Sequence, residues 1–134
     1  MLGLLRRIHR TFNKKYYTWL AKKTVARYTP PLRVHGRTKL TRNTYLGKNV
    51  NFNGTAIQGN GRVTIGDNFH SGEEVLFLTQ IHNYDSGDAI PYDHTVIVKD
   101  ITIEDNVWLG TRVTILGGVT IGDALRGQIG RAHV

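Results

Sequence analysis

Apolar side chains recur at every sixth position through the C-terminal half of the chain. They stand at Ile97, Ile103, Leu109, Ile115 and Ile121, and a second apolar residue follows each of them four positions later, ending at Leu125. Neither the 3.6-residue period of a helix nor the alternation of an ordinary strand produces this spacing. A chain that forms a short strand and turns a corner every six residues does. We therefore expect the two apolar positions of each repeat to face a shared interior.

The same period begins earlier, with lead positions at Val34, Leu40, Leu46 and Phe52. Near residues 57–60 it shifts by one residue and resumes through Ile65 and Phe77, with weak leads at Gly59 and Ser71. Positions four after a lead, among them Ala56 and Ile81, are also expected to face inward. Hexapeptide repeats are typical of a parallel β-helix, so the pattern predicts an all-β solenoid. At 134 residues the chain suits one such domain.

Residues 1–29 have a different pattern. From Leu2 to about Tyr28, apolar residues fall three or four apart among Lys and Arg, which predicts a basic amphipathic helix. Pro30 and Pro31 are expected to end it. Two interpretations remain open: the apolar stripe packs on the β body or a neighbouring subunit, or residues 1–28 make a peripheral contact with anionic lipid.

The six-residue period disappears between Ile81 and Val96. This stretch contains His82, Asn83, Tyr84 and Asp85, followed by turn-forming residues. We expect residues 80–96 to form an excursion loop, and loops on rigid scaffolds often carry function.

Charge is distributed unevenly along the chain. The formal net charge is +8, yet all 10 Asp and Glu residues follow residue 66 and most of the 18 Lys and Arg residues precede it. Cysteine is absent, which excludes disulfides and thiol nucleophiles and fits a reducing compartment. No apolar run is long enough to span a bilayer. The basic half contains no recognised nucleic-acid motif, so we expect no nucleic-acid partner.

The motifs taken together resemble a known family. The hexads, the loop beginning Ile81-His82-Asn83-Tyr84-Asp85, and the segment from Ile103 through Asn106-Val107-Trp108-Leu109-Gly110 to Asp123 are similar to the hexapeptide-repeat O-acetyltransferases, of the sugar, capsule and lipopolysaccharide type. The resemblance covers about residues 34–125. It implies a left-handed parallel β-helix over residues 30–127, a homotrimer, and acetyl-CoA bound in the groove between adjacent subunits.

The resemblance also implies residue roles. His82 matches the general base, which would remove the proton from an acceptor hydroxyl; histidine suits this because it titrates near neutral pH. Asn83, Tyr84 and Asp85 would contact a carbohydrate or glycolipid acceptor, although Tyr84 stands where many relatives have a second histidine. Trp108, Gly110 and Thr111 would border acetyl-CoA. The expected activity is acetyl transfer to a sugar hydroxyl, in the cytoplasm or at the inner membrane face.

Two alternatives remain open at this point. A zinc enzyme on the same fold would need a histidine cluster, and His70, His82 and His94 do not reproduce the close pair of the γ-type carbonic anhydrases, so no metal site is expected. A non-catalytic trimeric scaffold or membrane-surface module is the other.

Residues 128–134 read Gln-Ile-Gly-Arg-Ala-His-Val, which is what a common sequencing-library adapter encodes in one reading frame. We expect this segment to be non-native and the repeat to be truncated at its C-terminal end. The truncation would remove part of the acetyl-CoA site, because the position 18 residues after Thr111, usually small in the family, is Ile129. Whether this chain is itself active stays open.

Overall fold

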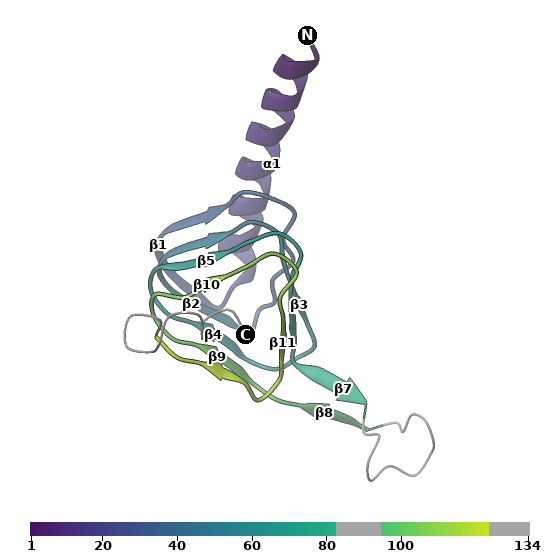
Figure 1. Ribbon diagram of the computed structural model, residues 1–134, viewed down its shortest axis with the longest axis vertical. Helices are drawn as coiled ribbons and strands as arrows, with labels where there is room; N and C mark the ends of the chain where they lie inside the picture. Colours follow the sequence, from purple (N-terminus) through teal and green to yellow (C-terminus); the bar gives the residue numbers. More distant parts are fainter. Residues whose placement is uncertain (83–94, 124–134) are drawn as a thin grey trace.

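The computed structural model describes residues 1–82 and 95–123, and these are mostly β-structure with one N-terminal helix (Figure 1). The elements are α1 (Leu2–Thr24), β1 (Arg27–Val34), β2 (Thr44–Phe52), β3 (Thr55–Gln58), β4 (Val63–Ile65), β5 (Phe69–Ser71), β6 (Val75–Leu78), β7 (Gln80–His82), β8 (Val96–Val98), β9 (Ile101–Ile103), β10 (Trp108–Leu109), β11 (Thr114–Leu116) and β12 (Thr120–Ile121).

The strands of the body form a curled parallel sheet and a smaller parallel sheet beside it. The first part of β2 pairs with β4 and its last part pairs with β5. The long strand β2 therefore connects these two neighbours within one seven-stranded sheet. Strands β3, β6 and β11 form the second sheet. In Figure 1 the two sheets curl around a common interior.

The register of the pairs follows the sequence repeat. Leu32 pairs with Val50, and Ile103 pairs with Ile121, 18 positions later in each case. Val63 and Ile65 pair with Ile101 and Ile103, a separation of 38 that also appears in the side-chain hydrogen bond between Asn68 and Asn106. The larger separation spans the excursion loop, so the chain leaves the sheet and returns to it in register.

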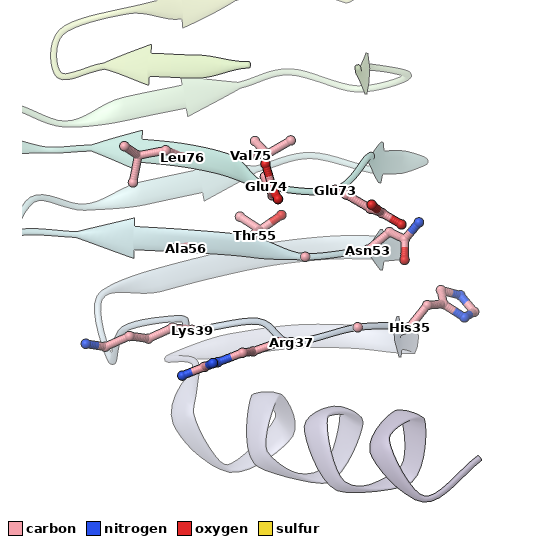
Figure 2. A pocket seen from close by; sticks show the side chains of 12 residues that line it. His35, Arg37, Lys39, Asn53, Thr55, Ala56, Glu73, Glu74, Val75 and Leu76 are labelled. Atoms are coloured by element: carbon pink, nitrogen blue, oxygen red, sulfur yellow. The ribbon is translucent and has the colours of Figure 1, made fainter. Parts of the chain in front are cut away.

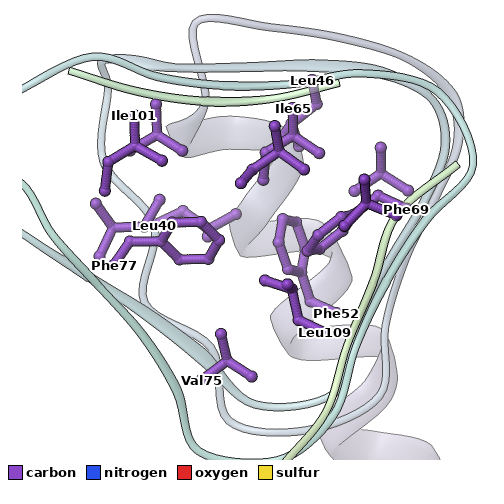
Figure 3. Packing of buried hydrophobic residues seen from close by; sticks show 14 of the residues in the cluster. Leu40, Leu46, Phe52, Ile65, Phe69, Val75, Phe77, Ile101 and Leu109 are labelled. Carbon is purple, nitrogen blue, oxygen red and sulfur yellow. The ribbon is translucent and has the colours of Figure 1, made fainter. Parts of the chain in front are cut away.

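Inward-facing side chains from successive strands fill the interior (Figure 3). The lead positions Ile103, Leu109 and Ile115 are at most 2% exposed, which confirms that the six-residue period marks inward positions. Phe52 and Phe69 lie with ring centroids 5.6 Å apart. The weak lead Ser71 is fully buried, because its hydroxyl forms a 2.7 Å hydrogen bond with that of Thr55 and so satisfies both polar groups inside the core.

Some positions of the repeat differ from the prediction. The predicted one-residue shift is the sum of two changes: the repeat loses one residue before Thr55, which is buried in place of Ala56, and gains two between Ile57 and Val63. Ile81 is 41% exposed rather than inward, and Ile97 lies opposite it in the antiparallel β7–β8 pair. Both residues belong to the base of the excursion, where strand pairing replaces packing in the core.

The helix is also shorter than predicted. α1 ends at Thr24, ahead of the two prolines, because Val25 is extended and buried and Ala26 already donates a hydrogen bond to Thr44 of β2. Pro30 and Pro31 lie inside β1, which is an edge strand that pairs with β2 through an irregular register. Edge strands tolerate proline because one side needs no N–H donor. Within the described part of the chain, no helix is long and apolar enough to cross a membrane.

Candidate functional site

The excursion begins and ends at one point of the body. Thr79 is buried, its hydroxyl donates to the Gln58 carbonyl at 2.9 Å, and its own carbonyl accepts a 2.9 Å bond from the Lys99 amide. Between these residues the chain projects as the β7–β8 hairpin (Figure 1). His82 ends β7, lies opposite Val96, and is exposed. The predicted general base therefore lies on a projecting strand anchored by Thr79 and Lys99.

A small cleft lies at the base of this hairpin, with a volume of about 120 Å³. Its walls are largely apolar and include Leu78, Ile97 and Leu116, and Lys99 supplies one cation. The cleft is formed where β7 and β8 leave the β3–β6–β11 sheet. Sequence reasoning missed Lys99 and Leu116, because an outward position in a hexad gives no sign of which outward residues line a cleft.

The three predicted acceptor-binding residues, Asn83, Tyr84 and Asp85, lie outside the described residues, as does His94. Their placement relative to His82 therefore stays a prediction.

The predicted cofactor-binding residues lie elsewhere on the body. Trp108 points outward from β10 and is 52% exposed, in register with His70 of β5. Gly110 and Thr111 follow in the turn that leads to β11, and Thr111 is exposed. A Cβ added to Gly110 would have nothing within 4 Å, so this turn presents an open surface.

His82 and Thr111 lie at opposite ends of the small sheet within one chain. Thr111 precedes β11, whereas His82 follows β6, and these two strands are parallel neighbours. The length of the sheet and the outward projection of the hairpin therefore separate them. The described chain does not bring the predicted base and the predicted cofactor residues together.

A groove of about 620 Å³ follows the corner on which Thr111 lies (Figure 2). Its residues come from the segment after β1, the start of β3 and the start of β6. Arg37 and Lys39 lie toward one end, and Glu73 and Glu74 toward the other (Figure 2). Glu74 forms a 2.9 Å ion pair with Arg112, the residue after Thr111, so the groove leads to the predicted cofactor turn. Sequence reasoning did not indicate that these cations share a groove.

His35 also lines this groove. Much of its side chain remains open to solvent, but partial burial is the largest cause of a pKa below the usual value of 6.5. Lys14, His70 and Arg33 lower it further by charge repulsion, and a hydrogen bond with the side chain of Asn51 raises the pKa. The ring is therefore biased toward its neutral form.

The described residues contain no cluster of three or more His, Asp or Glu side chains suited to a metal ion. His70 and His82 belong to different sheets. A comparison with known proteins finds no matching family model and no curated protein with significant similarity.

Proposed function

We propose that this protein is an acetyl-CoA-dependent O-acetyltransferase that acts on a hydroxyl of a sugar or surface-glycan precursor, with His82 as general base. The observation that carries the proposal is an exposed histidine on a hairpin anchored to a rigid parallel sheet, beside an apolar cleft with one lysine. Rigid support of this kind favours precise positioning of a catalytic group.

The proposal includes a left-handed parallel β-helix. Parallel pairing throughout the body sheets, partners 18 positions apart and inward residues at six-residue intervals support the helical coil. The left hand follows from the resemblance alone.

In the proposed reaction, the His82 imidazole accepts the proton of the sugar hydroxyl as that oxygen forms a bond to the thioester carbonyl carbon. The carbon–sulfur bond then breaks, and the imidazolium returns the proton to the departing thiolate. Atoms and charge balance without a covalent acyl-enzyme. Positioning of the two substrates supplies much of the acceleration, since it replaces a bimolecular encounter with an oriented one.

The end of the groove that carries Arg37 and Lys39, away from Glu73 and Glu74, suits the anionic end of acetyl-CoA. Arg37 and Lys39 are cations within a recess of about 620 Å³, and the open turn at Gly110 lets an extended substrate lie across the backbone. Because Thr111 and His82 are separated within one chain, we place the complete site between copies: the hairpin of one subunit would reach the Thr111 corner of its neighbour in a homotrimer.

The first test measures thiol release from acetyl-CoA with a panel of monosaccharide and nucleotide-sugar acceptors. His82→Ala should abolish the acceptor-dependent rate, while the matched variant His9→Ala, on the exposed part of α1, should retain it. Acceptor-dependent transfer that survives in His82→Ala with unchanged circular dichroism would rule out the proposed base. A well-folded chain that binds an acceptor but acetylates none of the panel would favour the scaffold alternative.

Complementation tests the shared site. His82→Ala and Thr111→Trp would each be inactive alone, and a co-refolded equal mixture should recover about a quarter of wild-type activity if each site combines two neighbouring subunits of a closed trimer. No recovery from a mixture shown to contain hybrid trimers would mean that both residues serve a site within one chain, and an active Thr111→Trp variant would mean that Thr111 has no role.

A further inference from the structure

Helix α1 contacts the β body through one face of its last two turns. Ala21 is 4% exposed, Tyr17 packs against the core, and the Thr18 hydroxyl accepts a 3.0 Å bond from the Val34 amide. The earlier turns of α1 extend away from the sheets (Figure 1). The helix is therefore attached at its C-terminal end.

The apolar stripe of α1 lies on a different face. Residues Leu5, Ile8, Phe12, Tyr16 and Trp19 are 44–66% exposed. At about 100° per residue they fall within one narrow arc, and Tyr17 and Ala21 lie on roughly the opposite side of the helix. Phe12 stacks with Tyr16 at 6.5 Å, so the aromatic rings form a continuous surface. The interpretation that this stripe packs on the body of the same chain is therefore wrong, because the body contacts the other face.

Every charged residue on the polar surface of α1 is basic. It contains seven basic residues and no acidic one: Arg6, Arg7, Arg10, Lys14, Lys15, Lys22 and Lys23. Lys15 and Lys22 lie along one edge of the stripe on the helical wheel. Together with Lys14 and Arg33 they line a recess of about 550 Å³ that borders Trp19. Apolar rings and basic side chains thus meet at one boundary, as in helices that lie at a lipid interface.

We propose that α1 binds the surface of a membrane containing anionic lipid, with its aromatic stripe inserted among the acyl chains near the headgroups and the recess beside Trp19 receiving lipid phosphate. Charge decides between a membrane and a second copy of the chain. Two copies joined through their stripes would bring Lys15 and Lys22 of each together, and no acidic residue precedes Asp67 to balance them. An anionic bilayer supplies both the countercharge and the apolar medium. This proposal does not depend on the acetyltransferase activity.

The test is co-sedimentation of the full chain with phosphatidylcholine vesicles and with equal mixtures of phosphatidylcholine and phosphatidylserine. We expect binding to the mixed vesicles, weakened by salt, and little binding to phosphatidylcholine alone. Phe12→Ser with Trp19→Ser should lower the affinity about tenfold or more, since each ring buries a large apolar area. Lys14→Glu with Lys15→Glu should have a comparable effect on the mixed vesicles.

Matched controls lie on the body. Leu116→Ser removes an exposed leucine, and Arg42→Glu with Lys48→Glu reverses two exposed cations, so both should leave binding unchanged. Equal losses in the control and α1 variants would overturn the proposal, as would the absence of binding by the unmodified chain.

Trp19 emission gives a second readout that needs no α1 variant. In a Trp108→Phe background, the emission should shift to the blue on mixed vesicles and not on addition of inorganic phosphate. An equal response to phosphate would contradict membrane docking. Sedimentation velocity without lipid tests the alternative of a second copy. A lower particle mass for Phe12→Ser than for the unmodified chain would show that the stripe packs against a second copy, and it would also overturn the proposal.

Discussion

The Asp67 amide donates a 2.7 Å hydrogen bond to the Asp105 carboxylate, 38 residues further along the chain. The same arrangement occurs on the neighbouring strands, where the Lys48 amide donates to the Asp67 carboxylate at 2.7 Å. A column of carboxylate acceptors thus connects successive corners of the curled sheet, and it continues across the excursion that carries His82.

Removing one acceptor from this column should weaken the fold modestly. Asp105→Ala leaves the Asp67 amide to water, and we expect the free energy of unfolding to fall by about 1 kcal/mol in urea denaturation. Asp105→Asn keeps a side-chain oxygen and should lose less. Equal losses in the two variants would show that the hydrogen bond to Asp67 is not what Asp105 contributes.

Asparagine at the same corner serves a conformational purpose. Asn68 has a φ of +58°, its side-chain Nδ2 donates to the Asn106 side chain at 2.9 Å, and its side-chain Oδ1 accepts from the Asn49 side chain at 3.1 Å. Asn68→Ala loses these bonds and adopts a left-handed backbone at a cost, whereas Asn68→Gly loses the bonds but tolerates the backbone. The alanine variant should therefore be less stable than the glycine variant by about 1 kcal/mol in thermal or urea unfolding. The reverse order would contradict this explanation of the corner.

Two leucines separate inward from outward positions of the repeat. Leu109 is fully buried and Leu116 is 54% exposed. Leu109→Ala should reduce the free energy of unfolding by about 2–5 kcal/mol, because it leaves a cavity in the core. Leu116→Ala should change it by no more than about 0.5 kcal/mol. Similar losses for both, measured by urea denaturation, would mean that the interior is assigned to the wrong face.

The pKa of His35 should respond to Lys14. Since burial and cationic neighbours lower this pKa in the folded state below 6.5, the folded chain binds the proton less readily than the unfolded chain. The contribution of His35 to stability is therefore fully present above pH 6.5 and is lost as the pH falls through the folded pKa. Lys14→Gln should move the pKa of His35 upward in an NMR titration, and Lys22→Gln should move it less. A pKa of His35 above 6.5 in the unmodified chain would contradict the assignment.

The sequence repeat predicted most of the inward positions, because a six-residue period with apolar leads is a strong pattern that few structures share. Ile103, Leu109 and Ile115 are buried as expected. The weak lead Ser71 also faces inward as predicted, because its hydroxyl pairs with that of Thr55. The period failed where other forces replaced core packing, since antiparallel pairing takes Ile81 outward. The end of α1 was misplaced because strand pairing at Ala26 overrides the helical pattern.

The candidate site was less accessible to sequence reasoning. His82 stood out because it begins the break in the period. The clustering of Arg37 and Lys39 with Glu74 depends on the register of three segments that are far apart in sequence, which a single sequence does not fix. Asn83, Tyr84 and Asp85 remain predictions.

The central claim is that the chain leaves the sheet after Thr79 and returns to it in register at Lys99, so that His82 projects from a rigid base. The chain contains no cysteine, so an introduced pair at Thr64 and Thr102 can be joined by a short thiol cross-linker and mapped by mass spectrometry. These two positions are paired on adjacent strands, about 4.8 Å apart. We predict efficient cross-linking within one chain for Thr64→Cys with Thr102→Cys, and little for Thr64→Cys with Thr114→Cys, which lies in the other sheet. Equal yields, or a preference for the second pair, would contradict the account.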